Sequence, residues 1–184
     1  MALQITIGVS GQKEINRMLG VQTKAIKDLR PAWKEVSRVL SEFQKGVFLG
    51  KGKGSSKSWY GVSASSSLPA WKPLKASTRK QKAAQGYTKY ANYPLIRTGA
   101  LMDAWTKDKA KGAVREIHPT WMAHGINESE IPYSPYHQLG KGVPKRRHFR
   151  VPSSLRKIVP KIIQKHLAKT GQLVRSTPGR GIFR

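Results

Sequence analysis

One stretch organises the chain, Tyr93-Pro94-Leu95-Ile96-Arg97-Thr98-Gly99-Ala100-Leu101. A short apolar run ends at Arg97, Thr98-Gly99 interrupts it, and a new apolar pattern at helical spacing begins at Leu101. The side-chain oxygen of Thr98 can cap a helix, and Gly99 lets the backbone turn without a Cβ clash. The stretch therefore predicts a strand-to-helix corner, with a short helix or turn over residues 101–107.

The segments on either side of this corner predict short elements. Upstream, Ser77 or Thr78 can cap a basic helix that runs to about residue 85, before Gly86. Downstream, residues 114–118 and 121–126 predict two strands of a hairpin, and residues 131–142, rich in Pro and Gly, predict a loop.

Longer elements are predicted towards the two ends. Apolar residues alternate over residues 3–9, which indicates a strand, and a helical period follows from about residue 13 to 47. Pro31 interrupts that period and predicts either a kink or two helices. An amphipathic helix capped by Ser153 and kinked at Pro160 is predicted near the end. The apolar positions predicted to face the core are Trp33, Val36, Val39, Leu40, Phe43, Val47, Leu155, Ile158, Val159, Ile162, Ile163 and Leu167.

These elements predict an α+β fold in which a small antiparallel sheet packs with a long N-terminal helix, kinked or split, and a C-terminal helix. Residues 1–169 form one domain in this interpretation. A flexible basic loop is inserted at residues 50–67, which are rich in Gly, Ser and Lys, and residues 170–184 form an extended basic tail.

The charge is strongly one-sided. Among 184 residues there are 35 Lys and Arg but only 9 Asp and Glu, which gives a formal net charge of +26. Residues 43–102 and 131–184 contain no acid. Such a surface repels itself, so we expect a polyanionic partner or acidic protein neighbours, with nucleic acid the leading polyanion. The alternative is a highly soluble surface with no partner of this kind.

Cysteine is absent and no basic-then-apolar leader opens the sequence, which favours a protein made in the cytoplasm. No apolar run approaches bilayer-spanning length, so we expect no membrane contact.

The residues that usually carry catalysis do not assemble into a known pattern. None of the five histidines has zinc-protease spacing, and the Gly/Lys-rich segment at 50–57 does not match a phosphate-binding P-loop. His118 and His124 could approach each other across the hairpin, but a lone pair is a poor metal site. We therefore predict no catalytic, metal or cofactor site and no enzymatic activity. A metal-dependent nuclease using acids such as Glu116 or Glu128 is the enzymatic alternative.

Several polar and aromatic residues have a structural and a functional interpretation. Tyr87, Tyr90 and Tyr93 could stack on single-stranded nucleic acid, although tyrosines at such a spacing more often anchor a loop. His137 and Gln138 can bond the backbone of an irregular loop. Arg97 can bridge to a carbonyl or carboxylate, for which Asp103 is one candidate.

The order of short motifs resembles a known family. Trp71-Lys72-Pro73-Leu74, Ser77-Thr78-Arg79-Lys80, Arg97-Thr98-Gly99-Ala100-Leu101, Tyr136-His137-Gln138-Leu139-Gly140 and Arg147-His148-Phe149 precede the last helix. This order is similar to that of the virion morphogenesis or tail-completion proteins of tailed bacteriophages, over about residues 43–169. The chain departs from the family at Tyr133-Ser134-Pro135-Tyr136 and at Pro144–Arg150.

The resemblance implies a structural protein of the head–tail junction or tail end, located in the virion and assembled in the host cytoplasm. Such proteins usually form rings, so we expect a homo-oligomer that contacts portal, connector, neck or tail proteins and encloses genomic double-stranded DNA. The motif residues that the resemblance assigns to the domain and its assembly are Trp71, Arg97, Thr98, Gly99, Leu101, His137, Gln138, Gly140 and Phe149.

The basic residues expected to contact DNA or acidic partners are Lys51, Lys53, Lys57, Lys145, Arg146, Arg147 and Arg150. A free, sequence-independent nucleic-acid-binding protein that uses the 50–57 loop and the 145–150 cluster is the alternative function.

Overall fold

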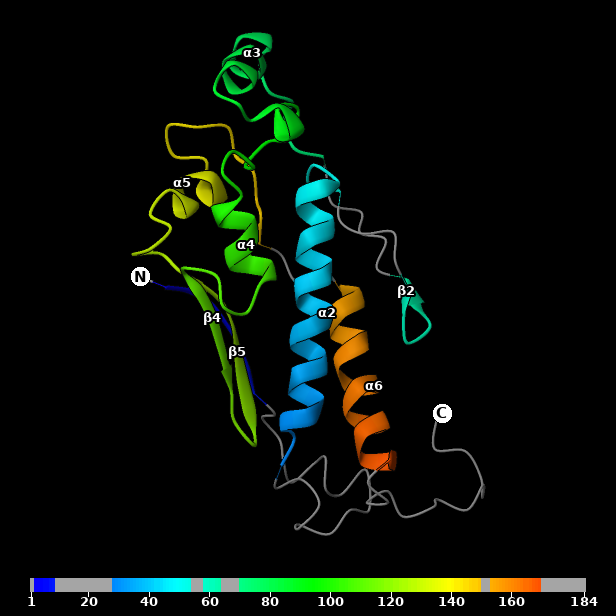
Figure 1. Cartoon of the computed structure of the whole chain (residues 1–184). Helices are drawn as coiled ribbons and strands as arrows, with labels where there is room; N and C mark the ends of the chain where they lie inside the picture. Colours follow the sequence, from blue (N-terminus) through cyan, green and yellow to red (C-terminus); the bar gives the residue numbers. More distant parts are fainter. Residues whose placement is uncertain (1, 9–27, 54–57, 64–69, 150–152, 170–184) are drawn as a thin grey trace.

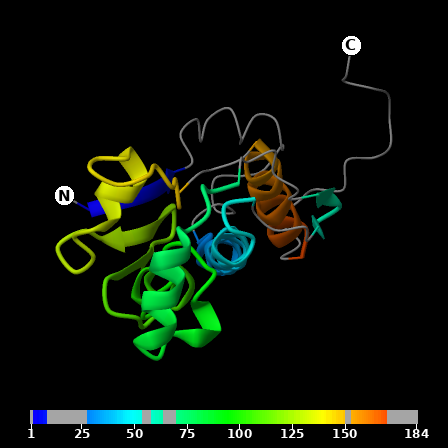
Figure 2. The same ribbon diagram turned by 90° about the horizontal axis from the view of Figure 1, so that it is seen from above.

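The fold was analysed in a computed structural model, which describes residues 2–8, 28–53, 58–63, 70–149 and 153–169. It is an α+β fold built around one long helix, α2 (Arg30–Leu49). Figure 1 shows α2 between a sheet with helix α4 (Ala100–Thr106) on one side and helix α6 (Ser153–Lys169) on the other. The view from above in Figure 2 shows the same layers.

The sheet has three antiparallel strands in the order β1-β5-β4. These strands are β1 (Ala2–Gly8), β4 (Ala113–Ile117) and β5 (Trp121–Asn127). The register pairs Ala2 with Asn127 in one ladder and Ala113 with Ile126 in the other. The predicted first strand and the predicted hairpin are therefore confirmed.

The core lies where α2 meets its neighbours on both sides. Trp33, Phe43 and Phe48 of α2 are fully buried, as are Trp105 of α4 and Met122 of β5. All six positions of α2 predicted to face inwards are buried. In α6 the predicted stripe also faces the core, with Leu155, Ile158, Ile162 and Leu167 buried and Val159 and Ile163 packed against them. Burial on two sides explains why α2 carries more apolar residues than a surface helix needs.

Pro31 lies in the first turn of α2. A proline is tolerated there because the first amides of a helix have no partner within the helix. The helix predicted before Pro31 and the tail 170–184 lie outside the described residues. Pro160 lies inside α6, as predicted.

The predicted basic loop contains a small hairpin. Strands β2 (Ser58–Trp59) and β3 (Val62–Ser63) pair with each other, and the Trp59 side chain is buried. The interpretation of residues 50–67 as one flexible loop was therefore wrong for 58–63, because Trp59 packs into the core cluster. Residues 54–57 and 64–67 lie outside the described residues.

Three short helices lie towards one end of the molecule (Figure 1). They are α3 (Ala76–Ala84), the 3-10 turn η1 (Thr88–Tyr90) and α5 (Ser134–Leu139). The loop predicted over 131–142 was wrong, since Pro135 occupies the first turn of α5 and Gly140 ends it in the left-handed conformation. The N-cap of α3 is Lys75, so neither Ser77 nor Thr78 caps that helix.

The predicted strand before the corner was also wrong, because residues 93–99 form turns. Leu95 has a φ of 62°, a left-handed value that no strand residue adopts. The helix after the corner is confirmed as α4. Its N-cap is Gly99 at φ 93°, while the Thr98 hydroxyl accepts a weak hydrogen bond from the Ala100 amide at 3.3 Å.

Candidate functional site

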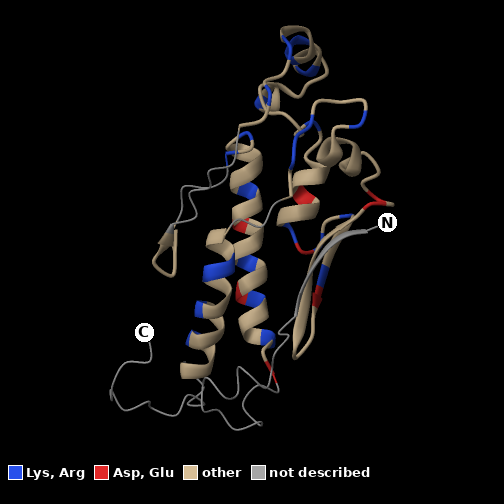
Figure 3. Ribbon diagram, turned by 180° about the vertical axis from the view of Figure 1, so that it is seen from behind, with Lys and Arg blue, Asp and Glu red and all other residues tan. Residues whose placement is uncertain are grey.

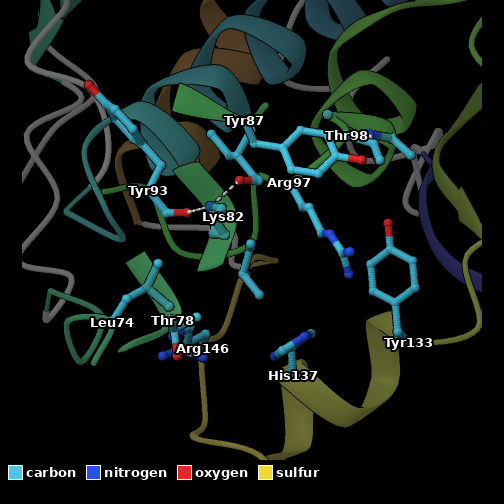
Figure 4. Close-up of a pocket in the computed structure, with 14 residues that line it drawn as sticks. Leu74, Thr78, Lys82, Tyr87, Tyr93, Arg97, Thr98, Tyr133, His137 and Arg146 are labelled. Atoms are coloured by element: carbon cyan, nitrogen blue, oxygen red, sulfur yellow. Dashed lines mark hydrogen bonds between the residues drawn. The ribbon is translucent and has the colours of Figure 1, made fainter. Parts of the chain in front are cut away.

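A pocket of about 670 Å³ lies between α3 and α5. Its walls come from α3, the turns at 87–99, the region of α5 and the segment around residue 146. Figure 4 shows Arg97, His137 and Tyr133 around a common space, with Thr78 and Arg146 to one side. No Asp or Glu is among the described residues that line the pocket.

Lys82 holds one wall of the pocket in place. Its Nζ donates to the carbonyl oxygens of Tyr90 and Tyr93, at 2.7 and 2.9 Å, and to that of Ile96. An ammonium group has three N–H donors, so these three bonds satisfy it. Burial, followed by the nearby Arg97 charge, lowers the pKa of Lys82. The turns that replace the predicted strand are therefore tied to α3 by one side chain.

The tyrosines of this wall anchor the turns, which supports the structural interpretation. Tyr90 and Tyr93 contact each other edge to face, with centroids 5.9 Å apart, and both pack against the core cluster. Arg97 donates to the Gln85 side chain at 2.8 Å and lies 5.6 Å from the Tyr87 ring centroid. The suggested partner Asp103 pairs with Lys107 instead, at 2.8 Å.

The opposite wall depends on a close approach between α5 and the segment after it. The Arg146 amide donates to the His137 carbonyl at 2.8 Å. A Cβ on Gly140, at φ 82°, would lie 2.9 Å from the Lys145 Cβ. Two features of this position therefore require a glycine: the left-handed backbone conformation, and the close approach of the chain at Lys145.

Arg146 is the one described residue of the predicted contact cluster that is not on the surface. Only 7% of Arg146 is exposed, whereas Lys145 and Arg147 are exposed. The chain returns against α5 at this point, where the Arg146 amide bonds the His137 carbonyl, and this approach encloses the Arg146 side chain. The prediction that Arg146 forms an open surface contact was therefore wrong.

The Arg146 side chain is incompletely bonded. Its Nη2 makes a long contact of 3.4 Å to the Lys72 carbonyl, and its buried Nε has no partner among the described residues. The buried Nδ1 of the neighbouring His137 has no partner in that part of the chain either. Burial lowers the pKa of both groups, and the Arg146 charge lowers that of His137 further.

Other motif residues stabilise this end of the molecule through hydrogen bonds from their side chains to backbone groups. Gln138 bonds Phe149 twice, accepting from its amide at 3.2 Å and donating to its carbonyl at 3.0 Å. Trp71 donates to the Arg147 carbonyl at 3.1 Å and meets the ring of Phe48 edge to face. These motif residues are structural.

In the interior beside the pocket, the motif residues His148 and Phe149 meet Trp105 and Ser134. Trp105, which stacks on Phe149 at 5.1 Å, donates through Nε1 to His148 Nδ1 at 3.2 Å. His148 Nε2 therefore carries the ring proton and faces Ser134, whose Oγ lies 3.0 Å away. Burial lowers the pKa of His148 to about 4. The sequence signals for this cluster were the apolar run around Trp105 and the motif Arg147-His148-Phe149. Nothing distinguished Lys82 from the other lysines of its helix.

The remaining basic candidates occupy the same end. Lys51 is exposed, with Nζ 5.2 Å from the Tyr93 ring centroid, and Lys53 is also exposed. Lys57 and Arg150 lie outside the described residues. Leu101 is fully buried at the start of α4.

His118 and His124 do not form a pair. His124 is buried and bonded to Ser37 Oγ at 3.0 Å, whereas His118 is exposed and stacks on Trp121 at 4.0 Å. Across the described ranges, no group of three or more His, Asp or Glu side chains could hold a metal ion. A search of the same ranges found no helix with the length and apolar character that crossing a bilayer requires.

A scan against models of protein families, a search of curated proteins and a search of solved structures each returned no match for this chain.

Proposed function

We propose that this protein is a structural component of the head–tail junction of a tailed bacteriophage, a neck or tail-completion protein. In this proposal it assembles as a ring, joins the portal or connector side of the capsid to the tail, and turns a basic surface towards DNA or acidic partner proteins. It has no catalytic role.

The observation that carries the proposal is the convergence of the motif residues. Trp71, Arg97, His137 and Phe149 are far apart in the sequence, yet they lie around the pocket or in its supporting wall. The Trp71 side chain holds backbone, those of Arg97 and His137 line the pocket, and that of Phe149 stacks on Trp105 behind it. An end fixed by many specific contacts suits an assembly surface that must present one shape to its neighbours.

The charge distribution supports a polyanionic or acidic neighbour. Most described acids are already paired with a nearby base, as in Asp28–Arg30, Glu35–Arg38 and Glu130–Lys111. Helices α3 and α6 contain no acid. Figure 3 shows Lys and Arg along α2 and α6 and on α3, with few acids between them. A ring of such subunits would present a cationic wall, which binds phosphates without reading bases.

Light scattering during size-exclusion chromatography measures the oligomeric state and so tests ring formation. Electron micrographs of particles with this subunit labelled test its position in the particle. We expect a closed oligomer, alone or with a connector protein, and label at the junction between head and tail. A protein that stays monomeric with every connector protein and never enters particles contradicts the proposal.

The acid-free outer face of α6 favours a second candidate, a free nucleic-acid-binding protein. Arg156, Lys157, Lys161 and Lys165 are exposed along it. Both candidates predict that retention on DNA weakens steeply as salt rises, because phosphate binding releases counterions. Tight DNA binding by a protein that never joins particles distinguishes the free binder, and retention indifferent to salt excludes DNA contact in both.

A further inference from the structure

We infer that the pocket between α3 and α5 binds the carboxylate side chain of a partner protein, and that the exposed face of α5 forms the surrounding contact. The inference depends on the proposed function only for the partner being a neighbour in the particle. It names the chemistry by which that neighbour is recognised.

The first argument is the buried, incompletely bonded guanidinium of Arg146. A guanidinium remains charged at any physiological pH, so burial cannot neutralise it. Burying a charge without a counter-charge costs free energy that a paired anion recovers. The long bond to the Lys72 carbonyl supplies no counter-charge, and neither the buried Nε nor the buried Nδ1 of His137, on the same wall, has a partner among the described residues. A carboxylate accepts such bonds in the geometry that an arginine fork offers.

The second argument is the charge of the pocket as a whole. Lys82, Arg97, His137 and Arg146 line it, and none of its described lining residues is acidic. All three N–H groups of the Lys82 ammonium donate to backbone carbonyls. Lys82 can therefore attract an anion by its charge but has no hydrogen bond left to offer it. Arg97 is held at Gln85 and Tyr87, and Figure 4 shows its guanidinium extending towards the space above His137. Three cationic side chains, those of Lys82, Arg97 and Arg146, and no described acid therefore line the pocket, which favours an anionic occupant.

The third argument is the surface around the pocket mouth. Tyr133, the N-cap of α5, lines the pocket while 41% of it is exposed, and Tyr136 and Leu139 of α5 are 54% and 56% exposed. Tyr136 and Leu139 line a second hollow of about 420 Å³, together with Pro132, Pro135, Ser129, Glu128 and Lys141. Tyrosine and arginine surrounded by apolar side chains are typical of the central residues of protein interfaces.

The same features argue against a nucleic acid as the occupant. A duplex presents its phosphates on a convex surface and is held by exposed cations. Arg146 is recessed, and the residues that line the pocket from the region of α5 are Tyr133 and His137 rather than lysines. Apart from Arg97, which lines the pocket, the exposed cations lie outside it and include Arg79 and Lys80 of α3, the basic face of α6, Lys145 and Arg147. The pocket therefore fits one acidic side chain on an apolar segment.

The test uses the full chain labelled with ¹⁵N and the blocked peptide acetyl-Gly-Tyr-Glu-Leu-Gly-amide. The counterpart with Gln in place of Glu is the control probe. We expect a saturable shift of the Arg146 Nε–H resonance and of the His137 amide with the Glu peptide. Affinity for the Gln peptide should be about tenfold weaker. Equal binding of the two peptides, or shifts spread over exposed arginines only, overturns the inference.

Two adjacent arginines provide matched variants. Arg146→Gln and Arg147→Gln remove the same charge, but only the first removes a pocket donor. We expect about a tenfold loss of peptide affinity for R146Q and less than about twofold for R147Q. Equal losses would indicate diffuse attraction and overturn the inference. If R146Q does not fold, Tyr133→Ala on the exposed rim replaces it, with a loss of about fivefold expected and an unchanged affinity contradicting the inference.

A duplex oligonucleotide competes as the alternative occupant. We expect it to leave the Arg146 resonance unshifted, and a saturable shift at Arg146 would make this a phosphate site instead. Because peptide binding is measured on the isolated protein, it is independent of ring formation. A bound peptide with no ring contradicts the proposed function alone, and a ring with no peptide binding contradicts this inference alone.

Discussion

The body of the molecule and its α3–α5 end are held together by different forces. In the body, α2 buries Trp33, Phe43 and their neighbours against the sheet and α6. At the α3–α5 end, single polar side chains bind backbone: Lys82 holds three carbonyls, Gln138 holds Phe149, and Trp71 holds Arg147.

The reason for the difference is the size of the elements. α2 has 20 residues and can bury a long apolar stripe, whereas α3 has 9 and α5 has 6. Apolar burial is non-directional and tolerates small shifts, whereas hydrogen bonds fix position and orientation. The end that carries the pocket is thus positioned by directional contacts, and the body supplies most of the stability.

The largest effect is expected where the two regions meet, at Trp105. Trp105→Ala should cost roughly 3–5 kcal/mol of unfolding free energy, because it leaves a cavity between α2, the sheet and the 148–149 segment. Trp121→Ala is the matched control. Its ring is only half-buried and stacks on the exposed His118, so about 1 kcal/mol is expected. Urea denaturation measures both, and equal losses would contradict the central position of Trp105.

Acid should destabilise both regions, because each buries one histidine. Burial lowers the pKa of His124 to about 3, with the Arg115 charge adding, and that of His148 to about 4. His124 faces Ser37 and Trp105, and His148 faces Trp105, Ser134 and Phe48. Between pH 6.5 and 4 the unfolded chain therefore binds more protons than the native one.

Stability should accordingly be full above pH 6.5 and fall as the pH is lowered, by about 2 kcal/mol per histidine at pH 5. Urea denaturation at several pH values measures this. The carboxylates with lowered pKa, Asp28 and Glu35, lose their contribution only at more acidic pH. Constant stability between pH 6.5 and 5 would show that neither ring is buried as described.

Substituting two nearby glycines can distinguish the effect of backbone conformation on stability from the effect of close packing at the α3–α5 end. Gly140 and Gly142 both have positive φ, but a Cβ would meet Lys145 only at Gly140. Gly140→Ala should cost about 2 kcal/mol and Gly142→Ala about 1 kcal/mol, since only the first adds a clash to the conformational strain. Thermal denaturation followed by circular dichroism measures the difference. A larger loss at Gly142 would contradict the packing of residue 145 on α5.

The smallest loss of stability is expected when the two hydrogen bonds between the Gln138 side chain and the Phe149 backbone are removed. Gln138→Met keeps the volume but removes both bonds to Phe149, and should cost about 1 kcal/mol. Gln81→Met on exposed α3 is the control, and it should change stability by less than about 0.5 kcal/mol. Hydrogen exchange of the Phe149 amide should accelerate in Q138M alone. Unchanged exchange would show that these bonds do not hold this segment.

The body could be predicted from the sequence because its signals are periodic. Alternation at residues 3–9 and the stripes at Trp33–Val47 and Leu155–Leu167 correctly identified a strand and two helices. The α3–α5 end could not, because its elements are shorter than a pattern needs. Leu95-Ile96 resembled the end of a strand. The segment forms turns instead, and Lys82 of α3 bonds its carbonyl groups at Tyr93 and Ile96. Arg146 resembled its exposed neighbours, yet the return of the chain beside α5 buries it.

The fold class, the long central helix and the excess of positive charge could be inferred from the amino-acid sequence, because they depend on composition and on periods of two and 3.6 residues. Which basic side chains remain in solvent, and that Lys82 and Arg146 are enclosed, follows from the three-dimensional packing alone. That outcome depends on contacts between residues far apart in the chain, such as Arg146 with Lys72, for which no local pattern exists.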